Sequence, residues 1–237
     1  MSQKQEIKHL AFIMDGNRRW AKAKNLPVIA GHKEGVEALK KVTKYCLDHN
    51  IQDLTVYAFS TENWRRDSNE LNFLFKLLSE VALRELADLR KLGVKVDFLG
   101  DISKFDNFNI QENLSKLAQE TEANVKLNLH LALNYGSVQE LTRAVNKLRE
   151  QGDIENLSEE DISKNLYSSR MSDPEIMVRT GGEKRLSNFL LWQTANSELV
   201  FTETLWPDFA SDELDLIIKN YIKKKNQETK NLEVMSA

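Results

Sequence analysis

Hydrophobic residues follow two alternating patterns along this chain: short runs of consecutive apolar positions, and longer stretches with apolar residues every three or four positions. The first pattern is typical of strands buried on both faces, and the second of amphipathic helices. The expected strands cover residues 9–14, 54–59, 95–99, 127–134, 176–179 and 198–201. The expected helices cover residues 33–49, 70–92, 111–123, 138–149, 158–166 and 212–223. This alternation predicts an α/β fold with a mostly parallel central sheet flanked by helices.

The helix expected over residues 70–92 carries more apolar side chains than one buried stripe requires. Leu71 and Phe73 lie on opposite sides of its first half. We therefore expect this helix to bury two sides. Three arrangements remain open from the sequence: packing within the core, packing against a partner subunit, and lining an apolar tunnel.

Length and composition favour one folded domain. No linker rich in proline, glycine or serine divides the 237 residues, so we expect a single domain over residues 1–237, with residues 224–237 as a flexible tail. The hydrophobic share of 41% and the charged share of 29% exclude a disordered chain. A net charge of −3 provides no overall field that favours nucleic acid, so no nucleic-acid partner is expected.

Cysteine usage and hydropathy indicate the compartment. Cys46 is the only cysteine, which excludes an internal disulfide and favours a reducing environment. Its neighbours on an expected helix are apolar, so we expect a buried structural thiol. The first residues are polar and form no secretion signal, and no apolar run is long enough to span a membrane. These features predict a cytoplasmic protein.

The most informative polar cluster follows the first expected strand. It reads Asp15-Gly16-Asn17-Arg18-Arg19-Trp20. A loop between a strand and a helix lies at the carboxyl edge of an α/β sheet, where ligands usually bind. Gly16 lets the backbone approach a ligand, the next helix offers free N–H groups, and Arg18 and Arg19 add positive charge. These features suit a diphosphate, with Asp15 placed to hold a divalent cation. The alternative is a capped turn with solvated arginines.

A second cluster follows the second expected strand and should reach the same edge of the sheet. It comprises Ser60, Thr61, Glu62, Asn63, Trp64 and Arg66. A helix cap with solvated charges is the alternative interpretation, although Ser60 with Asn63 matches a capping box poorly. Gly31-His32 opens the helix expected from residue 33, where the helix dipole keeps an imidazole neutral. His32 can there donate a hydrogen bond to an anion or accept a proton.

A third cluster ends the fifth expected strand. Its residues are Arg179-Thr180-Gly181-Gly182, followed by Arg185, Leu186 and Ser187. Arginine forks match phosphate oxygens bidentately, so this segment suits a phosphate-bearing ligand. The common nucleotide-binding glycine motifs do not occur, nor does the spacing of a zinc site or of a serine-hydrolase nucleophile. The three clusters and the apolar helix together describe a site for ligands with an anionic head and an apolar tail.

These residues resemble a known family, the cis-prenyltransferases, and most closely its bacterial undecaprenyl diphosphate synthases. The resemblance extends from His9 to about Phe209. Its motifs are Met14-Asp15-Gly16-Asn17-Arg18-Arg19-Trp20-Ala21, Gly31-His32, Tyr57-Ala58-Phe59-Ser60-Thr61-Glu62-Asn63-Trp64, Asn134-Tyr135-Gly136, Arg179-Thr180-Gly181-Gly182, Arg185-Leu186-Ser187-Asn188-Phe189-Leu190-Leu191-Trp192-Gln193, Glu198 and Leu205-Trp206-Pro207-Asp208-Phe209.

The resemblance implies a homodimer whose parallel-sheet domain encloses an apolar tunnel. It implies an enzyme that adds isopentenyl diphosphate units to an allylic diphosphate, such as farnesyl diphosphate, and forms Z double bonds with the help of Mg²⁺. The implied product is undecaprenyl diphosphate, the carrier lipid of bacterial cell-wall synthesis. Peripheral membrane contact during product release is also compatible with this activity.

Residue roles follow from the same resemblance. Asp15 and Asn63 match catalytic positions, the latter assigned to proton removal, and Asp15 and Glu198 match magnesium ligands. The positions that match substrate contacts are Gly16, Asn17, Arg18, Arg19, Trp20, His32, Ser60, Thr61, Glu62, Trp64, Arg66, Arg179, Arg185, Leu186 and Ser187.

Two positions depart from the family pattern. Val28 stands where bacterial relatives usually have arginine, four residues before His32. The C-terminal segment from Tyr221 to Lys230 lacks their Arg-x-Gly motif, and Lys223–Lys225 offers point charges without bidentate geometry. Two alternatives therefore stay open: a non-catalytic or partner-dependent subunit that binds prenyl diphosphates, and a Z-prenyl synthase with a shorter product.

Overall fold

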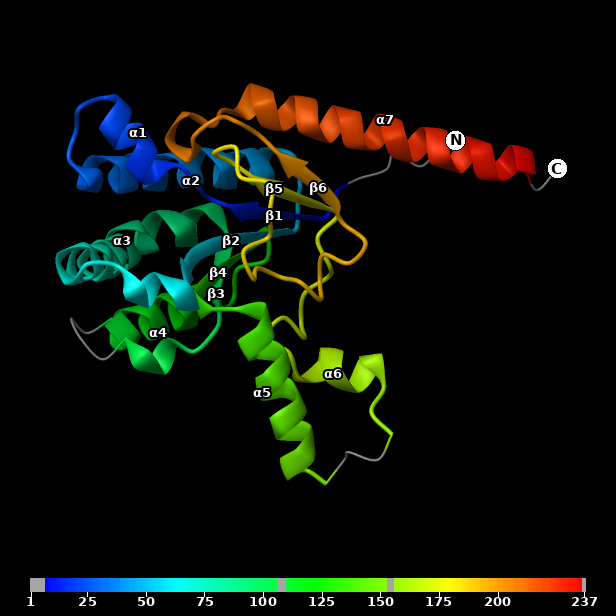
Figure 1. The fold of residues 1–237 in the computed structure, drawn as a ribbon, viewed down its shortest axis with the longest axis horizontal. Helices are drawn as coiled ribbons and strands as arrows, with labels where there is room; N and C mark the ends of the chain where they lie inside the picture. The colour runs from blue at the N-terminus through cyan, green and yellow to red at the C-terminus, as the bar shows by residue number, and fades with distance from the viewer. Residues whose placement is uncertain (1–6, 106–109, 153–155, 236–237) are drawn as a thin grey trace.

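A six-stranded sheet organises the computed structural model, which describes residues 7–105, 110–152 and 156–235 (Figure 1). All paired strands run parallel, in the order β3-β4-β2-β1-β5-β6. The strands are β1 (His9–Ile13), β2 (Asp53–Ser60), β3 (Val94–Leu99), β4 (Leu127–Tyr135), β5 (Ile176–Arg179) and β6 (Glu198–Phe201). The helices are α1 (Asn17–Ala23), α2 (Val28–Asp48), α3 (Ser68–Leu92), α4 (Ile110–Thr121), α5 (Ser137–Glu150), α6 (Glu159–Asn165) and α7 (Ser211–Met235). Short 3₁₀ turns are η1 (Thr61–Arg65), η2 (Ile102–Lys104) and η3 (Trp206–Asp208).

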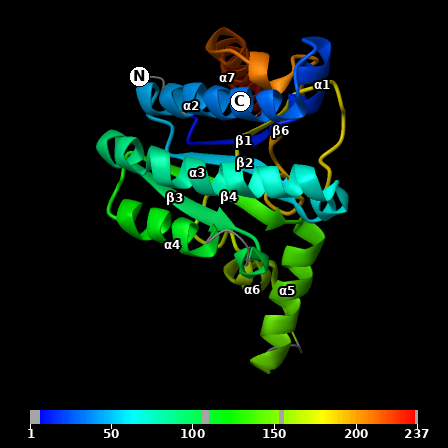
Figure 2. The same ribbon diagram turned by 90° about the vertical axis from the view of Figure 1, so that its left-hand side faces the viewer.

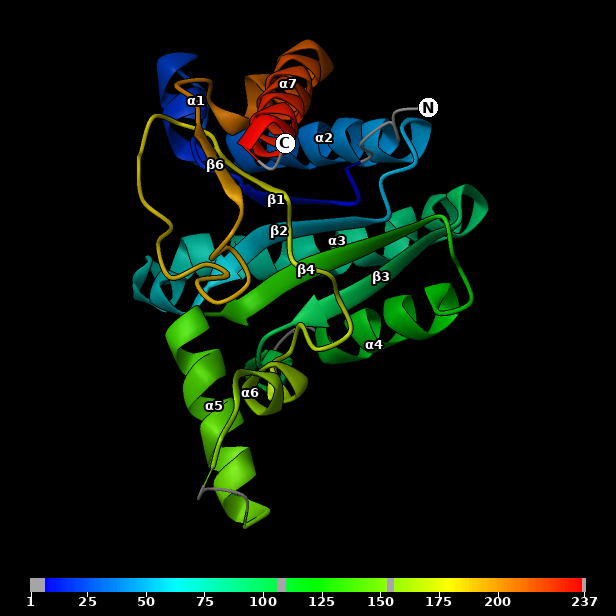
Figure 3. The same cartoon turned by 90° about the vertical axis from the view of Figure 1, so that its right-hand side faces the viewer.

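The two faces of the sheet are covered differently. Alternate residues of each strand point to opposite faces, so Leu10 and Phe12 belong to one core cluster, and Ala11 and Ile13 to another. The larger cluster packs against α2, α3, α4 and α7, and Figure 2 shows these helices along that side of the sheet. The smaller cluster is completed by residues that follow α6 and β5; the connecting segments and α5 and α6 lie on this side in Figure 3.

The predicted α/β domain with a mostly parallel sheet is confirmed. Each of the six predicted strands is present, and its ends differ from the prediction by at most one residue. The fold prediction succeeded because strands buried on both faces leave consecutive apolar runs, which few other elements of this length produce.

Two helices extend beyond the predicted bounds. Helix α2 begins at Val28, directly after Pro27, whose fixed φ of −56° suits the start of a helix. His32 therefore lies inside α2 rather than at its N-terminus, so the predicted free backbone N–H groups are not beside it. Helix α7 continues to Met235 and includes most of the segment predicted to be a flexible tail. That segment contains no glycine or proline, and an ion pair of 3.2 Å links Lys225 to Glu228 one turn later.

Helix α1 packs against α2 through two glycines. A Cβ atom at Gly31 would lie 2.0 Å from the carbonyl oxygen of Asn17, and one at Gly35 would lie 2.6 Å from its Oδ1. The missing side chains let the start of α1, and with it the loop after β1, lie directly on α2.

Two further expectations concern single features. Cys46 is fully buried, as predicted, and burial raises the pKa of its thiol to about 12, so it has no nucleophilic character at neutral pH. Among the helices of residues 7–105, 110–152 and 156–235, we find none whose length and hydropathy would let it cross a membrane.

Candidate active site

The predicted clusters meet at one edge of the sheet. Strands β2, β1 and β5 are neighbours, with Ile13 paired to Arg179, so their carboxyl ends lie side by side. A cavity of about 300 Å³ opens at this edge. Its lining consists of Met14, Asp15, Gly16, Asn17, Arg18, Arg19, His32 and Arg66. The structure thus gathers residues from the first loop, from α2 and from the segment after η1 around one space, as the sequence predicted.

Asp15 lies at the centre of this arrangement. Its Oδ2 accepts a hydrogen bond of 3.0 Å from Arg179, and its Oδ1 lies 3.2 Å from the guanidinium of Arg19. Its backbone oxygen accepts from the N–H of Trp206 at 3.0 Å and from the hydroxyl of Thr180 at 2.7 Å. The backbone is therefore fixed from two sides, and the carboxylate lies between two cations.

Arg179 connects the first and third clusters. Its side chain is only 4% exposed, and its second terminal nitrogen donates to the hydroxyl of Ser187 at 2.6 Å and to the backbone oxygen of Arg185. Both terminal nitrogens of the guanidinium thus have acceptors, whereas Nε is buried without a hydrogen-bond partner among the described residues. The loop after β5 is thus held in a fixed position against Asp15.

Glu70 organises the other side of the cavity and was not identified as a site residue from the sequence. Its Oε1 lies 3.1 Å from Arg66, 3.6 Å from His32 and 3.9 Å from Arg18, so one carboxylate faces three predicted diphosphate contacts. The spacing of four residues from Arg66 was the available signal. Burial of His32 lowers its pKa, and the charge of Arg66 lowers it further, so the neutral imidazole is favoured. The sequence also predicted a neutral imidazole, but on the basis of the helix dipole.

The second cluster forms the turn η1. The amide oxygen of Asn63 accepts a hydrogen bond of 3.2 Å from the N–H of Ser60, and the two residues form a reciprocal capping box. The prediction that Ser60 and Asn63 match this motif poorly was wrong, because the short amide reaches back across a tight 3₁₀ turn. Burial opposes the charge of Glu62, but hydrogen bonds, including those from its own backbone and from Asn188, hold its pKa below the usual value.

Two segments separated in the sequence hold this turn. Asn188 donates to Glu62 at 3.2 Å and so links the loop after β5 to η1. The indole of Trp64 donates to Oδ1 of Asn134 at 2.8 Å, and its ring packs against Phe59 and Phe75. The hydroxyl of Thr61 is buried and has no hydrogen-bond partner among the described residues. The turn is therefore fixed by its neighbours.

Several predicted site residues lie elsewhere. The buried indole of Trp20 donates to Asp208 at 2.7 Å and is not among the residues that line the cavity. Arg185 is exposed and pairs with Glu183, and Leu186 packs against the smaller core cluster. Glu198 begins β6 at the level of Ile176, toward the amino edge of the sheet, and its carboxylate pairs with Lys224. Within one chain, Glu198 and Asp15 therefore do not face the same cavity.

The donors around the cavity suit a magnesium ion. Mg²⁺ takes oxygen ligands, usually one or two carboxylates together with water and substrate phosphates. Asp15 is the only carboxylate of the lining, and the Oδ1 atom of Asn17 is buried without a hydrogen-bond partner among the described residues. The described parts of the chain contain no cluster of three or more His, Cys, Asp or Glu side chains arranged to hold a metal alone. The residues therefore fit an ion that shares its coordination with a bound diphosphate.

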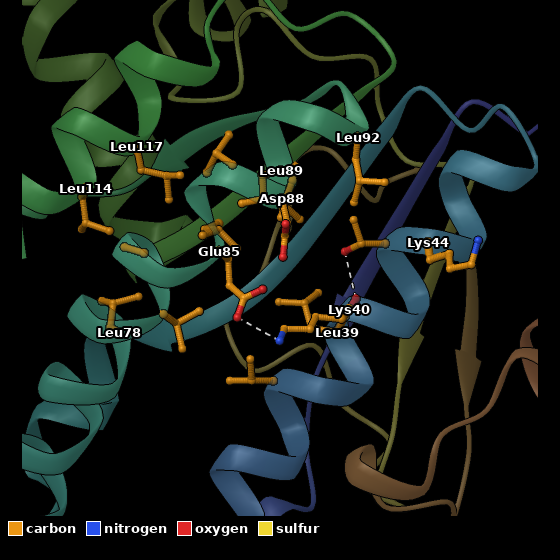
Figure 4. A pocket seen from close by; sticks show the side chains of 17 residues that line it. Leu39, Lys40, Lys44, Leu78, Glu85, Asp88, Leu89, Leu92, Leu114 and Leu117 are labelled. Atoms are coloured by element: carbon orange, nitrogen blue, oxygen red, sulfur yellow. Dashed lines mark hydrogen bonds and ion pairs between the residues drawn. The ribbon is translucent and has the colours of Figure 1, made fainter.

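Two apolar cavities lie near the polar one and are related to it by shared lining residues. A cavity of about 170 Å³ shares Met14, Asn17 and His32 with it. A larger one of about 330 Å³ lies among α2, α3, α4 and the sheet, and shares Leu39 and Leu78 with the cavity of 170 Å³ (Figure 4). Most lining residues are apolar in both cavities; the exceptions with polar side chains are Asn17 and His32 in the smaller one, and Lys40, Thr43, Lys44, Glu85 and Asp88 in the larger one. The polar cavity and the two apolar cavities together suit a ligand with an anionic head at Asp15 and an apolar tail along α3.

Comparison with protein families gives one match over most of the chain. Residues 13–229 match the family model described as "Putative undecaprenyl diphosphate synthase". An isoprenyl transferase of Heliobacterium mobile is 46% identical over 90% of this chain and 84% of its own length. An isoprenyl transferase of Wolinella succinogenes is 41% identical over 96% of this chain and 98% of its own length.

Solved structures with the same fold include two diphosphate synthases. The lavandulyl diphosphate synthase of Lavandula x intermedia, crystallised with dimethylallyl diphosphate, has a TM-score of 0.86 at 28% identity, over 91% of this chain and 95% of the other. A structure described as "a probable undecaprenyl diphosphate synthase" from Campylobacter jejuni has a TM-score of 0.77 at 35% identity, over 92% and 95% of the two chains.

Proposed function

Because this chain belongs to the undecaprenyl diphosphate synthase family of prenyltransferases, we propose that it condenses isopentenyl diphosphate units onto an allylic diphosphate and releases a Z-polyprenyl diphosphate. Farnesyl diphosphate is the proposed primer, and undecaprenyl diphosphate for the cell-wall carrier lipid is the proposed product. One observation carries the proposal: a cavity lined by Asp15, Arg18, Arg19 and Arg66 shares lining residues with an apolar cavity beside α3, which in turn shares residues with a second one.

The polar cavity is the proposed site of the allylic diphosphate. Arg18, Arg19 and Arg66 surround it with positive charge, and neutral His32 supplies a hydrogen-bond donor. When the carbon–oxygen bond to the diphosphate breaks, negative charge grows on the leaving group. Cations that are already in place stabilise that charge most at the transition state.

Mg²⁺ is the proposed cofactor, with Asp15 as its ligand and Asn17 as a neighbouring oxygen donor. The ion would neutralise charge on the departing diphosphate. Asp15 is held by Arg19 and Arg179, so coordination requires the carboxylate to exchange at least one of these partners. Glu198, the second proposed ligand, requires a partner subunit to approach the site, because its own chain keeps it away from Asp15.

Isopentenyl diphosphate is proposed to bind at the loop after β5. Arg179 and Ser187 are already joined there by a hydrogen bond, and Arg185 and Leu186 complete the proposed pocket. This loop is joined to the segment after β2 by the hydrogen bond between Asn188 and Glu62. That segment contains further predicted site residues, Ser60, Thr61 and Asn63. In the proposed step the carbon–oxygen bond to the allylic diphosphate breaks, a carbon–carbon bond to isopentenyl diphosphate forms, and the proton that isopentenyl diphosphate loses beside Asn63 passes to the released diphosphate. The amide oxygen of Asn63 is fixed by Ser60 and orients this region.

A homodimer in the cytoplasm is the proposed working unit. Strand β6 is an edge strand, paired only with β5 among the described strands, and Leu199 on it is 40% exposed. Exposed edges and apolar side chains are features that a subunit interface covers. Leu199→Glu should then shift the protein from dimer to monomer in gel filtration with light scattering, whereas a wild-type monomer with full activity would contradict the dimer.

A shorter Z-prenyl product is the second candidate. Of the two apolar cavities, the one of about 330 Å³ lies at the lower end of the size range of about 300–1,000 Å³ for ligand pockets, and the one of about 170 Å³ lies below it. Mass analysis of the product made from farnesyl diphosphate and isopentenyl diphosphate decides between the two lengths.

Asp15→Ala tests the proposed reaction. The purified chain with farnesyl diphosphate, radiolabelled isopentenyl diphosphate and Mg²⁺ should form polyprenyl diphosphate, and the variant should lose about 10³-fold in turnover, equal to about 4 kcal/mol of barrier. Asp48→Ala is the matched control, because Asp48 pairs with Lys44 on the surface of α2. Turnover of Asp15→Ala near the wild-type value would refute the assignment. No product from the wild-type chain alone would favour a partner-dependent subunit.

A further inference from the structure

The larger apolar cavity has one charged edge. Its lining includes Lys40 and Lys44 from α2 and Glu85 and Asp88 from α3, and in Figure 4 Lys40 extends toward Glu85. Lys44, Asp88 and Leu92 are exposed, so the cavity meets solvent on this side. The remaining lining is almost entirely aliphatic. A chain that fills this cavity therefore meets charge at one place only along the described lining.

Lys40 and Glu85 join the two helices across this edge. The Nζ atom of Lys40 lies 2.8 Å from Oε1 of Glu85 and 3.0 Å from Oε1 of Glu37. Arg84 adds a second contact of 2.8 Å to Glu85. The side chain of Glu85 is only 15% exposed. Burial opposes its charge, but hydrogen bonds from Lys40 and Arg84 hold the pKa of Glu85 below its usual value, so the pair stays ionised at neutral pH.

The position of this pair relative to the polar cavity is informative. Helices α2 and α3 are also linked by His32 and Glu70, at 3.6 Å, beside the diphosphate end. Between the two polar links, the residues that α2 and α3 contribute to both apolar cavities are Val36, Leu39, Leu78 and Val81. An apolar chain anchored at the Asp15 end therefore passes between aliphatic side chains before it reaches Lys40 and Glu85.

Contact with the pair is unfavourable for an apolar chain. Pressing hydrocarbon against an ion pair removes water from the charges without replacing its hydrogen bonds. Pushing the pair apart would leave a half-buried carboxylate with fewer partners. We propose that the Lys40–Glu85 ion pair is a specificity determinant that ends chain growth when the apolar end of the product reaches it. This inference rests on the proposed prenyl-transfer function.

The double substitution Lys40→Leu with Glu85→Leu tests this role. It removes both charges together, and the two residues that each lose a partner, Glu37 and Arg84, are exposed to water, which can solvate their charges. With farnesyl diphosphate, isopentenyl diphosphate and Mg²⁺, the products measured by mass spectrometry should lengthen by at least about one isoprenoid unit, since the apolar wall now continues. The rate of the first condensation should not change, because both residues are absent from the lining of the polar cavity.

The matched control removes a comparable ion pair that does not line the cavity. Arg90 and Glu120 join α3 to α4 at 2.9 Å, and neither belongs to the cavity lining. Arg90→Leu with Glu120→Leu should leave the product lengths unchanged. Lys40→Met is a milder variant that keeps side-chain volume and leaves Glu85 paired with Arg84, and it should also lengthen the products.

The outcomes separate this inference from the proposed function. If the wild-type chain forms no polyprenyl diphosphate, the proposed function fails. If it does, and both the double variant and Lys40→Met give the wild-type length distribution with an unchanged first condensation, the ion pair does not set product length. If the double variant does not fold, Lys40→Met decides by the same measurement.

Discussion

One guanidinium, that of Arg179, holds three parts of the candidate site together. It contacts the carboxylate of Asp15, the hydroxyl of Ser187 and the backbone of Arg185, and all but 4% of its side chain is buried. Arg179 is the last residue of β5. It pairs with Ile13 at the end of the neighbouring strand β1, which places it beside the loop that contains Asp15. A planar fork can direct donors to two sides at once, which a single ammonium group does not do. Charge alone is therefore not sufficient at this position.

Arg179→Lys should reduce kcat/KM for isopentenyl diphosphate by roughly 10- to 100-fold, because a lost charge-assisted hydrogen bond is worth about 1.5–3 kcal/mol. Steady-state kinetics with the isopentenyl diphosphate concentration varied measures this loss. Arg90→Lys, on the exposed side of α3, is the control and should leave kcat/KM unchanged. Wild-type kcat/KM for Arg179→Lys would show that the fork geometry is not required.

A second residue-scale prediction concerns Glu70, which faces Arg18, His32 and Arg66 in the absence of a ligand. Glu70→Gln keeps the shape but removes the negative charge, so the neighbouring cations repel each other without compensation. The free energy of unfolding should fall by about 1–3 kcal/mol. Inorganic diphosphate should then raise the melting temperature of the variant more than that of the wild type, because the anion replaces the lost charge.

The control for this prediction lies on the same helix. Glu80 and Lys76 form an exposed pair at 3.9 Å, so Glu80→Gln should change neither the unfolding free energy nor the response to diphosphate. An equal diphosphate response of Glu70→Gln and wild type would contradict the role of Glu70 in this cluster.

At the scale of elements, the sequence predicted strands better than helix ends. The consecutive apolar residues of β5 indicate its position directly, because both faces of an inner strand must be apolar. Helix α2 was predicted too short, since Val28 and Ile29 are partly exposed and add nothing to an apolar stripe. Pro27, which directly precedes Val28, is the feature of the sequence that marks the observed start of α2.

Helix α3 illustrates what a pattern leaves open. Its excess of apolar residues was compatible with a core, an interface or a tunnel wall. In the structure all four of these residues line the apolar cavities; Phe75 and Ala82 are buried in the core, whereas Leu78 and Leu89 are only partly buried. The choice depends on how far α2 lies from α3, and this spacing is a tertiary property that periodicity does not contain. Glu70 was missed for the same reason, because its partners come from three different segments.

The packing of α1 on α2 gives a prediction with a clear sign. Helix propensity alone favours Gly31→Ala by about 1 kcal/mol. The structure predicts the opposite, since the new Cβ would lie 2.0 Å from the carbonyl oxygen of Asn17, and overpacking typically costs about 1–3 kcal/mol. Urea unfolding should therefore show a less stable variant. Lys33→Ala, exposed on the same helix, should differ little from wild type, and a more stable Gly31→Ala protein would contradict the close contact.

At the scale of the whole molecule, the two faces of the sheet carry different chemistry. The face toward α2, α3 and α4 is apolar and contains the cavities. The opposite face carries a buried polar group formed by His9, Thr55, Asp53 and His130. His9 donates from Nδ1 to the backbone oxygen of Ser172 at 2.6 Å and accepts from Thr55 at 2.8 Å, so its neutral form fits this environment. Sequence patterning did not reveal this group, because its members come from three strands.

This polar group makes stability depend on pH. Burial lowers the pKa of His9 to about 4, whereas the unfolded chain takes up a proton near pH 6.5. Between these values the unfolded state binds more protons, so the stability contributed by His9 is present above pH 6.5 and is lost as the pH falls toward 4. The loss amounts to about 3 kcal/mol over this range. For His130, burial opposes the charge, but Asp53 and Asp97 outweigh it and raise the pKa, so its contribution is present below pH 6.5 and is lost as the pH rises through the raised pKa.

His9→Gln separates the two contributions in urea unfolding at pH 4.5, 5.5, 6.5 and 7.5. The variant should be less stable than wild type at pH 7.5, because its amide does not reproduce both hydrogen bonds of the imidazole. The difference should shrink toward pH 4.5, since only the wild type loses the His9 contribution in acid. His130→Gln should behave in the opposite sense, with its deficit largest below pH 6.5. A constant difference between His9→Gln and wild type across this range would mean that His9 takes up its proton equally in the folded and unfolded states, which its burial opposes.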